Sequence, residues 1–141
     1  MQRRICALGL DVGKKRVGVA GCDGIGLLAS PLTTINRQSF SQDVAKISQI
    51  VKEREINVLV VGLPYSMDGS LGPQAEYVQQ FAQRLAEALQ LPVEYVDERL
   101  TSVEAEEQLK SQKRFSRQDK GLIDRQAAAI ILQQWLDGRT A

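Results

Sequence analysis

The chain has 141 residues, of which 43% are apolar and 25% are charged, a composition typical of one compact soluble domain. Its 18 Lys and Arg side chains against 17 Asp and Glu side chains give a net charge of +1, so no global field recruits nucleic acid or an acidic membrane. The absence of histidine excludes Ser-His-Asp and Cys-His nucleophile schemes and removes the commonest metal ligand. We therefore expect a single domain over residues 1–141 that works with carboxylates, Lys, Arg, Ser, Thr or Tyr.

The N-terminal segment is not expected to act as a targeting signal. After Met1-Gln2-Arg3-Arg4 the apolar run is broken at Asp11, which makes it too short for a signal peptide or a membrane span. We expect a cytoplasmic protein. Cys6 and Cys22 lie in apolar, strand-like stretches without Cys-x-x-Cys spacing, and this pattern favours buried reduced thiols over a zinc site.

Three strands are predicted first. Residues 5–10 and 16–22 read as an antiparallel hairpin joined by the turn 11–15, and residues 26–31, after the Asp23-Gly24 turn, are expected to pair with the second strand. Ser41 is then predicted to cap a helix that ends near Glu55.

A second group of elements alternates strands with helices. Residues 57–62 form a continuous β-branched run, typical of a central parallel strand, and Pro73 opens a helix that stops before Pro92. Residues 93–97 are the next strand, followed by a helix from Thr101 toward Lys110. A basic loop, 111–120, precedes the last helix, 121–137.

This order predicts an α/β fold whose mixed five-stranded sheet combines antiparallel hairpin strands with parallel strands and is flanked by helices. An RNase H-like arrangement satisfies the handedness of the helical crossovers.

Acidic residues stand where ligands bind in such sheets. Asp11 follows the first predicted strand, and the alternative to a ligand role is an ordinary turn residue. Asp97 and Glu98 close a later strand, and because adjacent residues point to opposite faces, only one of them is expected to reach the site. A strand end can bend, so alternation does not decide between them, and Asp97 stays the reserve candidate.

Asp124 has the strongest physical argument. Helical steps of three, four and seven place it in line with Ala127, Ala128 and Ile131, on the face that packs inward. An unpaired buried carboxylate is costly, so it needs either a salt bridge, for which Arg99 or Arg125 is available, or a bound cation. We favour the cation once the other carboxylates are counted.

An all-oxygen site without histidine suits Mg²⁺ or Mn²⁺, and a pair of such ions can activate water and stabilise the leaving oxygen in phosphodiester hydrolysis. Basic side chains flank the acidic positions and fit a phosphate-rich substrate, although a solvated loop is the alternative. The residues expected to contact nucleic acid are Lys14, Lys15, Arg16, Arg99, Lys113, Arg114, Arg117 and Lys120.

Four ordered blocks of the sequence carry a family resemblance that spans nearly the whole chain. They are Gly9-Leu10-Asp11-Val12-Gly13 with Gly18-Val19-Ala20, Val61-Gly62-Leu63-Pro64 with Met67-Asp68-Gly69, Val96-Asp97-Glu98-Arg99-Leu100-Thr101, and Lys120 through Asp124 into Ala127-Ala128-Ala129-Ile130-Ile131-Leu132. Together they resemble the YqgF family of pre-16S ribosomal RNA nucleases, also described as Holliday junction resolvases. Arg125 departs from the small residue expected there, which could alter how substrate approaches.

The resemblance implies an RNase H-like fold related to RuvC resolvases, with Asp11, Glu98 and Asp124 as catalytic metal ligands for Mg²⁺ or Mn²⁺. It also implies a role in maturing the 5′ end of 16S rRNA, so that pre-rRNA is favoured over a four-way DNA junction as partner. No membrane partner is expected, and the chain should be a monomer or a weak homodimer.

Two other classes compete with the nuclease. Asp11-Val12-Gly13 followed by Gly18 also resembles the phosphate loop of actin-like and Hsp70-like ATPases, but those need two lobes and 141 residues supply one. A binding module could contact RNA without cleaving it, although such a module has little need for Asp124 on an apolar face.

Overall fold

The computed structural model describes residues 5–24, 26–65, 68–97 and 120–140, without the side chains of Lys120 and Thr140. The predicted helix from Thr101 and the loop 111–119 lie outside these residues. In chain order the elements are β1 (Ala7–Val12), β2 (Arg16–Cys22), β3 (Ala29–Asn36), α1 (Phe40–Arg54), β4 (Val58–Leu63), α2 (Pro73–Leu89), β5 (Val93–Asp97) and α4 (Lys120–Thr140).

The five strands form one mixed sheet in the order β3-β2-β1-β4-β5. β2 runs antiparallel to both β1 and β3, whereas β1, β4 and β5 are parallel. β4 is buried along its whole length, as its continuous apolar run predicts for an interior parallel strand. The predicted mixed five-stranded sheet is therefore confirmed.

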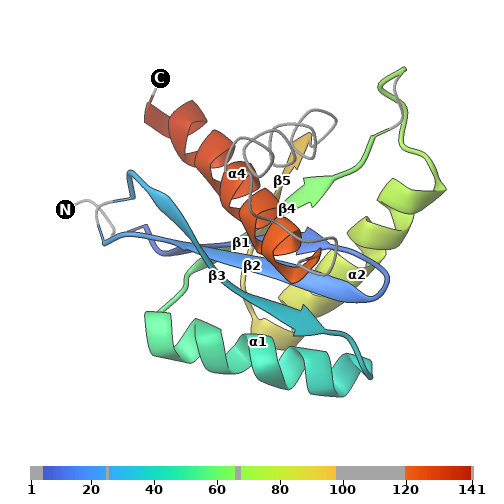
Figure 1. Ribbon diagram of the computed structural model, residues 1–141, viewed down its shortest axis with the longest axis horizontal. Helices are drawn as coiled ribbons and strands as arrows, with labels where there is room; N and C mark the ends of the chain where they lie inside the picture. Colours follow the sequence, from blue (N-terminus) through green and yellow to red (C-terminus); the bar gives the residue numbers. More distant parts are fainter. Residues whose placement is uncertain (1–4, 25, 66–67, 98–119, 141) are drawn as a thin grey trace.

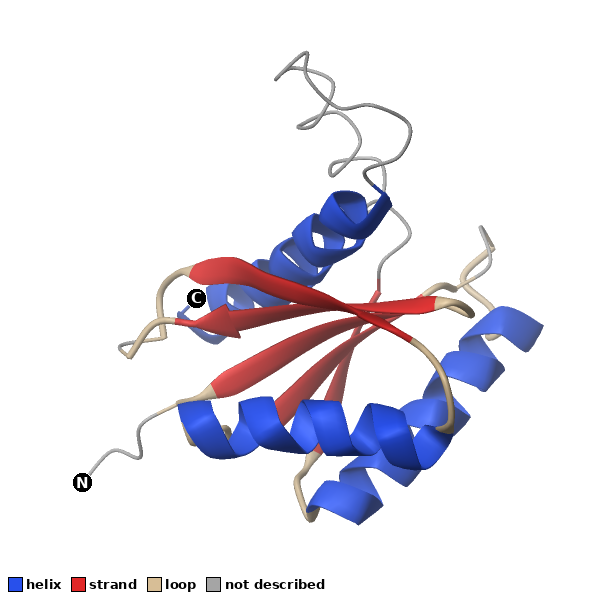
Figure 2. Ribbon diagram, turned by 60° about the horizontal axis from the view of Figure 1, so that its bottom comes forward, coloured by secondary structure: helices blue, strands red, loops and turns tan. Residues whose placement is uncertain are grey.

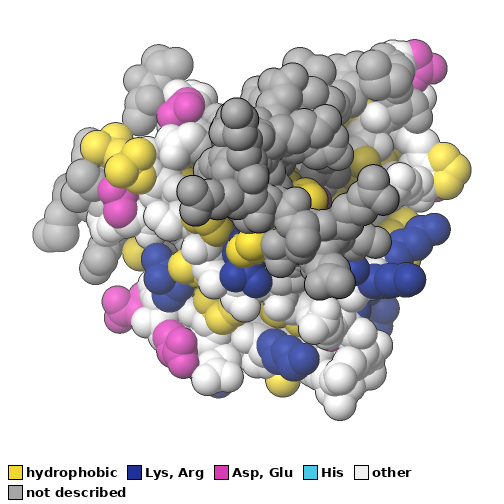
Figure 3. All heavy atoms as spheres, in the orientation of Figure 1, with side chains coloured by type: hydrophobic (Ala, Val, Ile, Leu, Met, Phe, Trp, Pro, Cys, Tyr) yellow, Lys and Arg dark blue, Asp and Glu magenta, His cyan; other side chains and the backbone are white. Residues whose placement is uncertain are grey.

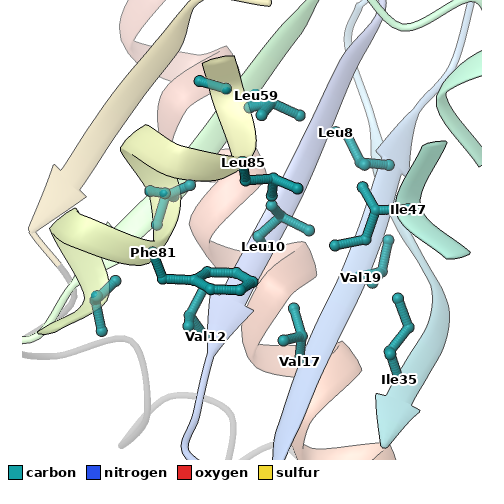
Figure 4. Packing of buried hydrophobic residues seen from close by; sticks show 14 of the residues in the cluster. Leu8, Leu10, Val12, Val17, Val19, Ile35, Ile47, Leu59, Phe81 and Leu85 are labelled. Atoms are coloured by element: carbon teal, nitrogen blue, oxygen red, sulfur yellow. The ribbon is translucent and has the colours of Figure 1, made fainter. Parts of the chain in front are cut away.

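Helices cover both faces of the sheet. α1 and α2 pack on one face and α4 lies across the other, so the sheet is the middle of three layers (Figures 1 and 2). The α1–α2 face is filled by large aliphatic and aromatic side chains, including Leu10, Ile47, Phe81 and Leu85 (Figure 4). The α4 face is lined by smaller side chains such as Ala7, Ala20 and Ala128. The small residues let α4 approach the sheet closely.

The first hairpin differs from the prediction by two residues. β1 spans Ala7–Val12 rather than 5–10, so Asp11 lies inside the strand, in register with Gly18. The turn is correspondingly short, because the N–H of Gly13 donates to the carbonyl of Arg16 at 2.8 Å.

The third strand was also misplaced, because β3 begins at Ala29 and continues to Asn36 instead of covering 26–31. The cause is the Asp23 carboxylate, whose Oδ1 accepts the backbone N–H groups of Leu27 at 2.8 Å and Leu28 at 3.3 Å and so extends the loop. The hydrogen bond from Leu27, followed by smaller backbone contributions, lowers the pKa of Asp23 below its ordinary value of 3.8.

The first helix starts at Phe40 and is capped by Ser39, not by Ser41 as predicted. Ser39 Oγ accepts the N–H of Gln42 at 3.2 Å while the Gln42 side chain accepts the N–H of Ser39 at 3.3 Å, a complete capping box. Glu55 ends the helix in a left-handed conformation with φ 55°, close to the predicted end. The other described elements fall within about three residues of their predicted bounds.

Both cysteines are free thiols, as predicted, with Cys22 buried and Cys6 half-buried. Among the described helices none combines the length and the apolar content that crossing a membrane requires.

Candidate active site

Alternation along β1 places Asp11 on the face of the sheet that α4 covers. Ala7 packs with α4, and a Cβ atom at Gly9 would lie 2.7 Å from Cβ of Leu132, so residues 7, 9 and 11 share this face. Leu10 and Val12 point to the opposite core. Asp11 is half-buried at the carboxyl end of β1.

Gly18 brings α4 next to Asp11. It is the cross-strand partner of Asp11 on β2, and a Cβ atom there would overlap the backbone carbonyl of Asp124. Directly opposed residues in an antiparallel pair have Cα atoms about 4.5–5.5 Å apart. The first turns of α4 therefore cross the sheet beside Asp11, and this crossing requires a residue without a side chain on β2.

The Asp124 carboxylate makes an ion pair with Arg16, the first residue of β2. Arg16 Nε lies 2.6 Å from Asp124 Oδ2, and the two side chains are 31% and 21% exposed. The salt bridge that the sequence left as the alternative to a cation is thus present among the described residues, with Arg16 as the partner. Arg125 Nε donates instead to Thr34 Oγ1 at 3.2 Å and ties α4 to β3, while Arg99 is outside the described residues.

The side chains of β5 alternate between the α4 face and the α1–α2 face of the sheet. Glu94 Oε1 accepts the Trp135 indole N–H at 3.0 Å and Val96 packs against the same cluster as α4. Val93 and Tyr95 pack against the opposite core, and by alternation Asp97 lies on their side. Glu98 comes directly after the described part of β5.

The turn between β1 and β2, which follows Asp11 in the chain, carries exposed basic side chains. Lys14 and Lys15 are exposed, and Lys and Arg side chains gather at the right of the view in Figure 3, where Figure 1 shows this turn. Arg37 holds the turn, because its side chain donates to the carbonyl of Gly13 at 2.8 Å and its backbone N–H donates to the carbonyl of Lys15 at 2.9 Å.

The remaining predicted nucleic-acid contacts fall beyond what the structure describes. These are Arg99, Lys113, Arg114, Arg117 and the side chain of Lys120.

Arg37 itself was not among the predicted site residues. Its guanidinium lies 4.4 Å from the ring centre of Phe81, and its Nε is 3.6 Å from Asp43 Oδ2. Asp43 is only 1% exposed and also accepts the N–H of Gln38 at 3.0 Å. The signal was present in the sequence: Asp43 stands four residues before Ile47, on the apolar face of its helix, where a carboxylate needs a partner.

The described carboxylates suit a hard divalent cation. Within residues 5–24, 26–65, 68–97 and 120–140, no group of three Asp, Glu, His or Cys side chains is placed to hold a metal ion. Two carboxylates, Asp11 and Asp124, flank Gly18 on one face, and the positive charge of Arg16 already compensates one of them. Carboxylate oxygens are the ligand type that Mg²⁺ and Mn²⁺ take, and the described residues supply two of the ligands that such an ion requires.

Comparison with known proteins gives close relatives for this arrangement. A family model described as "RuvX: Holliday junction resolvase" matches residues 5–138. A protein of Gloeothece citriformis is 73% identical over 139 residues, covering 99% of this chain and 92% of the relative. A protein of Rippkaea orientalis is 74% identical over 136 residues, covering 96% and 98%. Both relatives carry the name "Putative pre-16S rRNA nuclease".

Solved structures share the fold at low sequence identity. Thermus thermophilus RuvC in complex with a Holliday junction superposes with a TM-score of 0.59 at 14% identity, covering 97% of this chain and 96% of that one. The Fowlpox virus resolvase, also bound to a junction, gives 0.57 at 10% identity, covering 97% and 100%. These likenesses confirm the predicted RNase H-like fold of the RuvC type.

Proposed function

The chain belongs to the RuvX family, and on that premise we propose that it is a divalent-metal-dependent nuclease that hydrolyses phosphodiester bonds of structured RNA, with pre-16S rRNA as its substrate. The observation that carries the proposal is the position of Asp11 and Asp124 on either side of Gly18, on one face of the sheet. Family membership favours this reading over a lobe of an actin-like ATPase.

Three carboxylates are proposed to hold Mg²⁺ or Mn²⁺: Asp11 from β1, Asp124 from α4 and Glu98 after β5. Glu98 is preferred to Asp97 because the family resemblance assigns the role to that position, and because Asp97 lies by alternation on the side of Val93 and Tyr95, away from α4. When bound, such cations activate a water molecule and stabilise the leaving oxygen of a phosphodiester.

The chain's own residues would position the metal ligands and bind the phosphate groups of the substrate. Asp11 is fixed by its strand and Asp124 by the packing of α4, so the two carboxylates keep their separation without substrate. Lys14 and Lys15, on a turn that Arg37 holds, are placed to bind phosphate groups beside the carboxylates. The other basic residues predicted above are proposed to extend this contact: Arg16, Arg99, Lys113, Arg114, Arg117 and Lys120.

RNA is proposed over a DNA junction, and the oligomeric state bears on this choice. Symmetric resolution of a four-way junction needs two active sites. Each chain carries one Asp11 and one Asp124, so a chain that is monomeric in solution would argue for RNA processing, whereas a homodimer would supply the two sites of a resolvase. The names of the curated relatives point to RNA as the substrate.

The test compares Asp11→Asn and Asp124→Asn with the unmodified protein on a precursor 16S rRNA fragment and on a four-way DNA junction, with Mg²⁺ or Mn²⁺. We expect both variants to lose RNA cleavage while keeping their circular dichroism spectrum, because an amide is a poor ligand for these cations. Asp137→Asn is the matched control, since Asp137 is exposed on the same helix.

Different outcomes separate the alternatives. Junction cleavage without RNA cleavage supports a resolvase. Tight RNA binding without cleavage of either substrate supports a binding module. Full activity of either Asn variant removes that residue from the mechanism.

A further inference from the structure

We propose that Arg16 is a displaceable counterion of the metal site: it holds the Asp124 carboxylate while no divalent cation is present, and the cation must displace it to bind. The inference rests on the proposed metal-dependent nuclease. It adds a second role to the phosphate contact proposed for Arg16, because it makes metal affinity depend on this side chain.

The geometry places the Arg16 guanidinium directly on the Asp124 carboxylate, which is a proposed metal ligand. Its Nε lies 2.6 Å from Asp124 Oδ2, and within the described part of the chain Arg16 is the ion-pair partner of Asp124. A Mg²⁺ ion binds a carboxylate oxygen at about 2.0–2.1 Å. An ion bound to either oxygen of Asp124 would bring a double positive charge within about 5 Å of the guanidinium, and like charges this close repel each other strongly where solvent screening is incomplete. This repulsion favours movement of the guanidinium away from Asp124 when the cation binds.

The pair is accessible enough to be exchanged. The side chains of Arg16 and Asp124 are 31% and 21% exposed, so solvent and ions reach them. Arg16 begins β2 directly after the exposed Lys14-Lys15 turn, which gives its side chain room to turn outward. The pair can therefore exchange with an ion from solvent.

Arg125, in contrast to Arg16, helps to hold α4 on the sheet. Its Nε donates to Thr34 Oγ1, and the same hydroxyl donates to the carbonyl of Gly121, which fastens α4 to β3. The helix therefore stays docked without the Arg16–Asp124 pair. Arg16 can leave Asp124 without releasing α4 from the sheet.

The experiment measures Mn²⁺ binding to the RNA-free protein by calorimetry for the unmodified chain, Arg16→Gln, Arg16→Lys and Lys15→Gln. Without a guanidinium to displace, Arg16→Gln should bind Mn²⁺ about tenfold more tightly, the ratio that corresponds to one charge-assisted hydrogen bond of about 1.4 kcal/mol. The Mn²⁺ affinity of Arg16→Lys should lie between those of the unmodified chain and Arg16→Gln, because a lysine keeps the charge but not the planar Nε donor. Lys15→Gln removes a neighbouring charge and should change Kd by less than about twofold.

Thermal unfolding gives a second readout that is independent of cleavage. Without metal, Arg16→Gln should lower the melting temperature, because Asp124 loses its counterion. At saturating Mn²⁺ the difference from the unmodified protein should vanish, since the ion then fills the place of Arg16 in both. Arg16→Lys keeps the test valid if Arg16→Gln folds poorly.

The outcomes distinguish this inference from the proposed function. If the unmodified chain binds Mn²⁺, Asp124→Asn abolishes binding, and Arg16→Gln binds no more tightly than Lys15→Gln, Arg16 is not displaced and the inference is wrong. If neither the unmodified chain nor Arg16→Gln binds Mn²⁺, the metal-dependent mechanism itself fails, and the inference fails with it.

Discussion

Asp43 is a buried carboxylate on the α1–α2 side of the sheet that helps to position Arg37. It accepts the Gln38 N–H and faces the guanidinium of Arg37, which in turn holds the turn that carries Lys14 and Lys15. Asp43→Ala leaves that N–H without its acceptor and the largely buried guanidinium without its counter-charge, although the guanidinium keeps its hydrogen bonds to Gly13 and Tyr77. We expect the free energy of unfolding to fall by about 3 kcal/mol in urea titrations.

The double variant Arg37→Met with Asp43→Ala is the control for this pair. Removing the guanidinium as well should recover part of the lost stability, because no unpaired charge is then left behind. A loss below about 0.5 kcal/mol in Asp43→Ala, the size of an ordinary surface substitution, would show that the pair is unimportant.

The residues of the site differ in how far the sequence could predict their environment. Asp124 could be placed on an inward face from helical spacing alone, because that pattern is local. Its partner could not, because Arg16 is 108 residues away and only the docking of α4 on β2 joins them. Asp11 was predicted as a turn residue, since the register that draws it into β1 depends on pairing with Gly18. No described residue tests the roles of Glu98 or Asp97 as ligands.

At the level of elements, the crossing of α4 over β2 depends on Gly18. Gly18→Ala would place a methyl group onto the backbone carbonyl of Asp124, and neither backbone can yield easily. We expect a loss of about 1–3 kcal/mol in unfolding free energy, as for overpacked cores, together with weaker Mn²⁺ binding because Asp124 shifts. Thermal unfolding and calorimetry measure the two effects.

Gly138→Ala, on α4, is the matched control for Gly18→Ala. A Cβ atom at Gly138 meets no other atom within 4 Å, so this change should raise stability by about 0.5–1 kcal/mol through helix propensity. Equal effects of the two alanine substitutions would contradict the close crossing at Gly18.

Element boundaries were predicted best where the stop signals are local. Pro73 and Pro92 bracket α2 in sequence and in structure, because proline acts on its immediate neighbours. The start of β3 was wrong because the Asp23 side chain captures the next backbone N–H groups, a hydrogen-bond pattern that composition does not reveal. Pro31 lies within β3, where an edge strand tolerates its missing N–H group.

At the level of the whole molecule, a net charge of +1 means that nucleic-acid binding must come from local patches. Lys14 and Lys15 form one such patch, exposed on the turn that follows Asp11. The double variant Lys14→Gln with Lys15→Gln should reduce the slope of log K against log salt by about 0.7–0.9 per lysine. RNA binding measured at several salt concentrations checks this.

Lys46→Gln with Lys52→Gln is the control for the turn, since both residues are exposed on α1, on the opposite side of the sheet from α4. An unchanged salt slope in the turn variant would place the RNA contact elsewhere on the molecule.

The sheet architecture followed from the sequence because its pieces are periodic, and the parallel pairing of β1, β4 and β5 follows from the helices between them. What periodicity could not supply was the direction of α4 across the sheet, since that depends on where glycines allow backbone contact. Gly9 and Gly18 together define that path.

Because Arg16 and Asp124 are 108 residues apart, the ribosome makes them at different times. A ribosome adds about 5–20 residues per second, so roughly 5–20 s pass between the synthesis of Arg16 and that of Asp124. Throughout that interval the emerging chain has Asp11 but lacks α4. If Asp11 and Asp124 form the catalytic centre as proposed, a nascent chain cannot cleave RNA before its last described helix has been made.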